Sequence, residues 1–63
     1  MFVLVHNKTG KYVARPGEQY SYVPGLENAR AFRTRQDAER ERCQDSERIA
    51  SVESILDVLT GNR

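Results

Sequence analysis

Cysteine and histidine are almost absent from this chain of 63 residues, which contains one of each, Cys43 and His6. A lone cysteine has no partner within the chain, so a disulfide cannot add to its stability. One thiol and one imidazole are too few soft ligands for a structural zinc site, and we expect neither a metal nor another cofactor. A single unpaired cysteine is typical of a reducing compartment, which predicts a cytoplasmic protein.

Long apolar runs are missing as well. The only apolar stretch near the start, Phe2–Val5, is too short for a membrane span or a signal-peptide core, and no basic segment precedes it. We therefore expect no membrane partner. Repeats and low-complexity tracts are also missing, and the length allows one small domain, residues 1–63. A chain this short buries only about 60% of the surface it exposes when unfolded, so its stability depends on tight packing or self-association.

Charge of one sign is not in excess. Ten lysines and arginines are matched by nine aspartates and glutamates, which leaves a formal net charge of +1. With 38% hydrophobic and 30% charged residues, the composition is that of a soluble folded domain and is neither collagen-like, disulfide-rich nor that of a polyelectrolyte.

The beginning of the chain has the pattern of a β-hairpin. Phe2–Val5 and Tyr12–Ala14 are rich in β-branched and aromatic residues, which favour strands. Between them, Asn7 suits the first position of a type I turn and Gly10 suits the last, where a positive φ is often needed. The sequence therefore predicts an N-terminal hairpin on which a small antiparallel sheet is built.

Two Pro-Gly pairs divide the next segment. Proline presets the φ of a turn and glycine takes the left-handed position after it, so turns are predicted at both Pro16-Gly17 and Pro24-Gly25. Between them, Tyr20–Val23 is either a short edge strand or an extended loop with both tyrosines on one side. The apolar residues of Leu26–Phe32 fall at helical spacing and predict a helical turn that leads into a short extended piece around 31–33.

A surface helix is predicted over about 34–44. Thr34 followed three residues later by Asp37 resembles a capping box, with aspartate in place of the usual Glu or Gln. The apolar face of this helix is poor, because only Ala38 and Cys43 can pack well. We expect the helix to lie on the surface, with arginine stems covering apolar edges.

The last segment, 47–61, is compatible with two structures. Its apolar residues follow a three-four spacing that fits one continuous helix, with Gly61 at its end. The alternative is a strand over Arg48–Val52 followed by a short helix over Ser54–Leu59. We favour the alternative, because a lone hairpin is marginal and a further strand would bury it. The predicted fold class is α+β: a small antiparallel sheet, one helix at about 34–44 and a short C-terminal helix.

The first strand is apolar on both sides, since Phe2 and Leu4 point one way while Val3 and Val5 point the other. Either the two helices each cover one face, or a second copy or a partner protein closes one of them. Tyrosines next to the Pro-Gly turns add large, rigid surface of the kind that recurs in binding sites, although one or both can instead cap the core. The candidate protein-binding residues are Tyr20, Tyr22, Phe2 and Leu4.

No constellation of residues indicates catalysis. Cys43 and His6, with Asp45 or Asp37, form the only conceivable set of nucleophile, base and orienting group. In the predicted fold the cysteine lies in a solvated helix and the histidine at the end of a hairpin, and nothing points to a pocket. We therefore predict no catalytic residues and no enzyme.

Arginines gather in the segment 30–48 and suggest a nucleic-acid-binding module as a second hypothesis. Guanidinium groups bind phosphate through a bidentate fork, and the tyrosines offer surfaces for stacking bases. Acidic residues interleave with these arginines almost one for one, so little counterion release would drive binding, and a solvated mixed-charge face is the alternative. The candidate nucleic-acid-binding residues are Arg30, Arg33, Arg35, Arg40 and Arg42.

The stretch 26–39 resembles a pattern of very small bacteriophage and prophage proteins. In that pattern, a leucine after a tyrosine-bearing loop is followed by Ala29-Arg30-Ala31-Phe32, a Thr34 cap and the acidic-Ala helix start Asp37-Ala38. Similar hairpin and Glu-Arg-Ile segments extend the resemblance over 5–55. The resemblance implies an accessory protein of mobile-element origin and carries over no functional residue. Many such proteins of known role bind and modulate a host protein.

These observations predict a small non-enzymatic binding or modulator protein. Its partner is expected to be a host protein or a second copy of the chain. Nucleic acid ranks second as a partner, because the arginines come with matching carboxylates.

Overall fold

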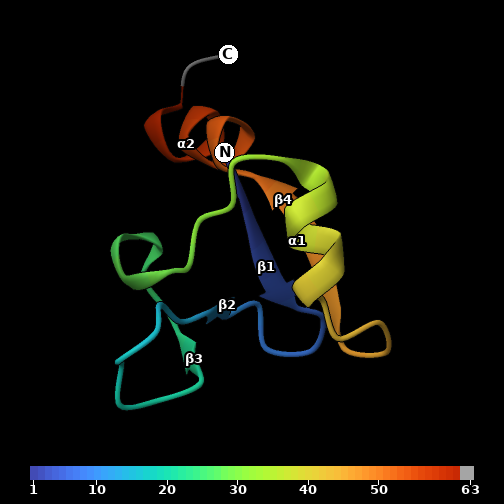
Figure 1. Cartoon of the computed structure of the whole chain (residues 1–63). Coiled ribbons are helices and arrows are strands. Elements are labelled where there is room, and N and C mark those ends of the chain that lie inside the picture. Colours follow the sequence, from blue (N-terminus) through green and yellow to red (C-terminus); the bar gives the residue numbers. More distant parts are fainter. Residues whose placement is uncertain (62–63) are drawn as a thin grey trace.

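The structure is a computed structural model that describes residues 1–61 (Figure 1). It contains four antiparallel strands in one sheet and two α-helices, the second of them C-terminal, which confirms the predicted α+β class. In chain order the elements are β1 (Phe2–His6), β2 (Tyr12–Val13), β3 (Tyr22–Val23), the 3-10 helix η1 (Leu26–Asn28), α1 (Arg35–Glu41), β4 (Glu47–Ser51) and α2 (Val52–Thr60).

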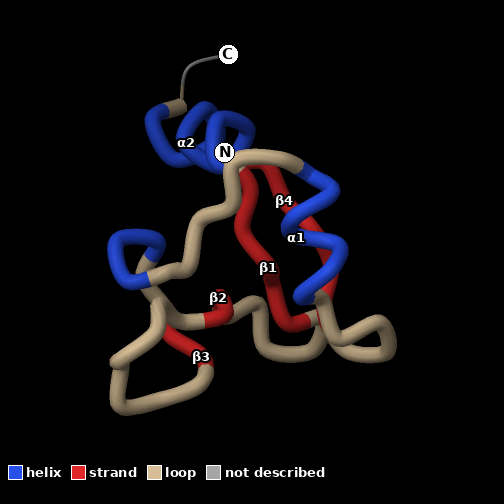
Figure 2. Tube along the Cα trace, viewed as in Figure 1, coloured by secondary structure: helices blue, strands red, loops and turns tan. Residues whose placement is uncertain are grey.

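The sheet has the strand order β3-β2-β1-β4, so β1 lies inside it. The longest pairing joins β1 to β4, from Phe2 opposite Ser51 to His6 opposite Glu47. Figure 2 shows these two strands side by side, with the short β2 and β3 beyond them. The prediction of a strand followed by a helix is confirmed for the last segment, with a strand that begins one residue earlier and a longer helix.

The turns agree with the sequence at two of the three predicted positions. Gly10 has a φ of 74°, in the left-handed region that favours glycine, and its N–H donates to the His6 carbonyl at 2.9 Å. Gly17 also has a positive φ. The prediction for Pro24-Gly25 is wrong: Gly25 is extended, with φ −100° and ψ 138°. The reason is that Gly25 is the N-terminal cap of η1, and a cap has an extended backbone.

One face of β1 is covered by α1 and the residues before it. Leu4, 1% exposed, packs with Phe32 and with Ala38, which is fully buried. The helix begins as predicted, because the Thr34 hydroxyl accepts the N–H of Asp37 at 3.0 Å. It ends at Glu41, short of the predicted 44, where the backbone becomes extended. The small side chain of Ala38 allows the helix to lie close over β1 and β4 (Figure 1).

The other face of β1 is covered by the segment after η1 and the beginning of α2. Val3 and Val5, 1% and 4% exposed, pack with Ala29, and side chains of η1 and α2 lie against this cluster. Both faces are thus closed within one chain, and neither needs a second copy. Leu4, predicted as a protein-binding residue, is instead placed in the core of the single chain.

We expect the substitution Leu4→Ala to lower the free energy of unfolding by about 2–5 kcal/mol, much of the stability of a domain this size. Truncation of this buried side chain would leave a cavity between β1 and α1. The control Tyr20→Ala removes an exposed side chain and should change stability by no more than about 0.5 kcal/mol. Urea denaturation followed by circular dichroism measures both. Equal effects would contradict this description of the core.

Candidate functional site

The first candidate is a polar cluster around Glu47, at the start of β4. Glu47 is 6% exposed and is the one buried charged residue among residues 1–61. Oε2 accepts the hydroxyl of Tyr22 at 2.5 Å, and Oε1 accepts the backbone N–H of Cys43 at 2.9 Å. Glu47 thereby joins β3, β4 and the loop after α1. The buried carboxylate has the donors it needs, as burial of a charge requires.

The hydroxyl of Tyr22 is a proton donor over the whole physiological range. Its hydrogen bond to Glu47, together with burial and the negative charge of that carboxylate, raises the pKa of Tyr22 to about 12. The ring of His6 lies edge-on to Tyr22, with 5.0 Å between the ring centroids. Nδ1 of His6 accepts the N–H of Lys8 at 3.2 Å, so this nitrogen faces its own turn. The arrangement is that of a structural bridge.

The residues considered for catalysis do not share one set of contacts. Cys43 is exposed, and it is the backbone N–H of this residue that contacts Glu47. Asp37 is paired with Arg40 on α1. Within residues 1–61, the His, Cys, Asp and Glu side chains form no group of three or more that could hold a metal ion. The absence of enzymatic activity stays a prediction.

Replacing Tyr22 with Phe should lower stability near neutral pH by about 1–2 kcal/mol, because a charge-assisted hydrogen bond is lost. The folded-state pKa lies above the unfolded value of 10, so the contribution is fully present below pH 10 and is lost as the pH rises toward 12. Urea denaturation of both proteins from pH 7 to 12 should therefore show a difference that shrinks above pH 10. A difference that is constant or grows with pH would contradict the bridge.

Of the five candidate arginines, three form ion pairs with carboxylates on α1. Such neighbours cancel the positive charge that would attract phosphate. The hydrogen bonds from Arg42 also lower the pKa of the Glu39 carboxyl, and Arg42 donates to the Glu47 carbonyl at 2.9 Å. The pairs are Arg30–Glu41 at 3.8 Å, Arg42–Glu39 at 2.7 Å and Arg40–Asp37.

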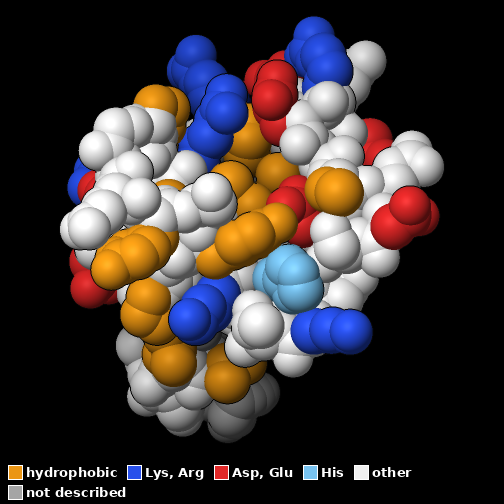
Figure 3. All heavy atoms as spheres, turned by 90° about the horizontal axis from the view of Figure 1, so that it is seen from below, with side chains coloured by type: hydrophobic (Ala, Val, Ile, Leu, Met, Phe, Trp, Pro, Cys, Tyr) orange, Lys and Arg blue, Asp and Glu red, His pale blue; other side chains and the backbone are white. Residues whose placement is uncertain are grey.

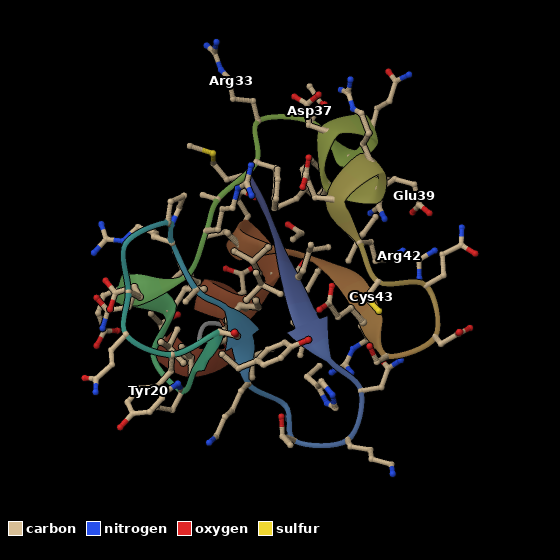
Figure 4. The ribbon with its side chains drawn as sticks, turned by 60° about the horizontal axis from the view of Figure 1, so that its bottom comes forward. Tyr20, Arg33, Asp37, Glu39, Arg42 and Cys43 are labelled. Carbon is tan, nitrogen blue, oxygen red and sulfur yellow. The ribbon has the colours of Figure 1, made fainter. Side chains whose placement is uncertain are left out.

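The remaining two arginines do not make a cationic surface. The guanidinium of Arg35 lies over the Phe2 ring, 5.1 Å from its centroid. Arg33 extends away from the body of the molecule (Figure 4). Figure 3 shows basic and acidic side chains interspersed over the face seen from below. The structure thus places the five arginines around α1 without an excess of positive charge.

The four predicted protein-binding residues are not brought together. Leu4 is in the core, Phe2 is half-buried beneath Arg35, and Tyr22 is bound to Glu47. Only Tyr20 is largely accessible, with 67% of its surface exposed. It lies in the loop between β2 and β3 and points outward, away from α1 (Figure 4). A single exposed tyrosine is ordinary for a protein surface.

The largest exposure of aliphatic side chains is found on α2. Leu56, Val58 and Leu59 are 47%, 73% and 69% exposed, and no residue of this helix is buried. An open groove of about 420 Å³ lies between α2 and β4, with almost entirely apolar walls. Its lining residues are Ala50, Ser51, Ser54, Ile55, Val58 and Leu59.

The direction of α2 explains why this groove stays open. Ser51 is both the last residue of β4 and the cap of α2, with its Oγ accepting the N–H of Ser54 at 3.4 Å. Val52 and Ile55, in the first turns, reach the cluster of Val3 and its neighbours. The later turns continue beyond the core. The sequence does show apolar residues at helical spacing in this segment. That spacing does not show which of these residues the sheet covers and which stay exposed.

Comparison with protein-family models, curated proteins and solved structures finds no match to this chain. The resemblance to bacteriophage and prophage proteins accordingly stays a prediction. Among residues 1–61, neither helix combines the length and the apolar character that crossing a bilayer requires.

Proposed function

We propose that this protein is a non-enzymatic binding domain that docks an apolar surface of a second protein molecule, of the same or a different kind, in the groove between α2 and β4. The observation that carries the proposal is the exposure of Val58 and Leu59 beside that groove. Contiguous apolar surface with a polar surround is typical of protein interaction sites, whereas scattered exposed residues are not. A cytoplasmic modulator from a mobile element fits this function and is part of the proposal.

The shape of the groove supports a protein partner. It has a helix for one wall and a strand for the floor, and it extends along α2 from Ser54 to Leu59. A helix or strand of a partner fits such a surface, because side chains on one side of either element can enter it. Nucleic acid is not favoured, since none of the residues within 1–61 that line the groove carries a cationic side chain.

The proposal can be tested by placing a photo-reactive phenylalanine analogue at position 59 and irradiating cells that express the protein. Leu59 is exposed at the groove, so replacing it should leave the fold intact. The photo-reactive side chain should then form a covalent adduct with the molecule that docks in the groove. The same residue placed at Tyr20 tests the other exposed candidate. We expect adducts from position 59 and not from position 20, as read by gel mobility and mass spectrometry.

A second change shows whether the adduct depends on the groove. Val58→Glu in the same chain puts a charge among apolar walls and should abolish the adduct. Thr60→Glu, on the same helix but outside the groove lining, should not. Absence of adducts at position 59, or adducts that Val58→Glu leaves unchanged, would contradict the proposed function.

A further inference from the structure

The outer edge of β4 has backbone groups that nothing in the described chain pairs. Asn7 N–H donates to the Ser46 carbonyl and Val52 N–H to the Met1 carbonyl, both at 2.8–2.9 Å, so Arg48 and Ala50 between them face β1. Hydrogen-bonding direction alternates along a strand, so the backbone N–H and C=O groups of Ile49 and Ser51 point away from β1, toward the open edge. Among residues 1–61 neither of their N–H groups, nor the carbonyl of Ile49, has a hydrogen-bond partner.

The rest of that edge is already occupied. The N–H of Glu47 donates to the Cys43 carbonyl at 2.9 Å, and its carbonyl accepts from Arg42. The open part of the edge is therefore the end that adjoins the groove, since Ser51 belongs to both. An unpaired edge next to an uncovered apolar surface is the combination that invites another strand.

From this juxtaposition we infer that the occupant of the groove is a second copy of this chain, paired β4 to β4 about a two-fold axis at Ala50. The inference rests on the proposed function and names its partner. In an antiparallel pair centred on Ala50, Ile49 lies opposite Ser51 of the second copy, and Ser51 lies opposite its Ile49. The outward groups of these residues then satisfy one another, with the Ser51 carbonyl using the lone pair that α2 leaves free.

The same axis brings the two grooves together. Ala50 is the floor of the groove, and its side chain is on the face of the sheet that also carries Val3 and the beginning of α2. An axis normal to the sheet at this residue places both α2 helices on that face, one on each side of the axis. The small side chain at the axis leaves room for Val58 and Leu59 of each copy to enter the space in front of the other. One symmetric contact thus covers edge and groove at once.

Charges also match across this contact. Arg48 shares the face of Ala50, and its guanidinium contacts Asn7 at 3.3 Å, with no carboxylate paired to it among residues 1–61. The charges of α2 are both acidic, Glu53 and Asp57. In the pairing centred on Ala50, Arg48 lies opposite Val52 of the second copy, beside that acidic helix. A net charge of +1 on each copy opposes association only weakly.

The test is sedimentation equilibrium of the purified full chain from micromolar to millimolar concentration, with a matched pair of variants at Ser51. Wild type should show a monomer–dimer equilibrium. Ser51→Pro removes the outward N–H at a φ of −81° that proline accepts, whereas Ser51→Ala loses the same capping hydroxyl and keeps the N–H. We expect the proline variant to raise the dissociation constant at least about tenfold over the alanine variant. Equal effects, or a wild-type monomer at every concentration, would overturn the inference.

A measurement on the unchanged protein covers the case in which the proline variant does not fold. Amide hydrogen exchange by NMR should slow at Ile49 and Ser51 as the protein concentration rises, while exchange at the amide of Tyr20, an exposed residue remote from β4, should not change. Exchange at Ile49 and Ser51 that is independent of concentration would overturn the inference. A monomer whose position 59 still cross-links to a different protein would overturn only the identity of the partner, and the proposed function would stand.

Discussion

The fold depends on one constraint, a central strand that has no polar face. β1 presents Leu4 to one side and Val3 and Val5 to the other, and all three are almost fully buried. A short chain has to supply an apolar layer on each side of this strand. It does so with small side chains, Ala38 on one side and Ala29 on the other, because small residues let a helix or a loop approach the sheet closely. Each layer is thin, and together they use most of the apolar material available.

The part of the sheet away from β4 is held in a different way. β2 and β3 pair over two residues only, which gives few backbone hydrogen bonds. The bridge from Tyr22 to Glu47 ties β3 to the far side of the sheet, passing the end of β1. Since the carboxylate also accepts the Cys43 N–H, one buried group orders three segments. This polar contact thus adds to the apolar packing of the short strands, in which Val23 is buried and Tyr12 and Val13 pack against the core.

The local features of this fold could be read from the sequence, and the non-local ones could not. The hairpin, the Thr34 cap and the strand before α2 depend on turn chemistry and side-chain periodicity within a few residues. Glu47 stands opposite His6 only because of the register between β1 and β4, so its contact with Tyr22 had no local signal. The prediction of a left-handed Gly25 is wrong because a Pro-Gly pair also suits the entry to a 3-10 helix.

The candidate site shows the same division. The sequence indicates that a chain this short has difficulty covering its apolar surface. It points to β1 as the exposed surface, because the side chains on both faces of this strand are apolar. The structure closes β1 and leaves the uncovered surface on α2, because local pattern does not reveal the angle at which a helix leaves a strand. Tyr20 and Tyr22 look equivalent in sequence, yet one is exposed and the other bonds to a buried carboxylate.

The apolar residues at the end of α2 cannot be explained by the stability of a single chain. A side chain contributes to folding in proportion to the apolar surface it removes from water, at about 25 cal/mol per Å². Val58 and Leu59 keep more than two thirds of their surface in solvent, so they return little of that energy, unlike Leu4. Helix propensity does not require valine at position 58 either, because valine is a weaker helix former than lysine or glutamate. These two side chains would remove most of their apolar surface from water only if a partner filled the groove that they line.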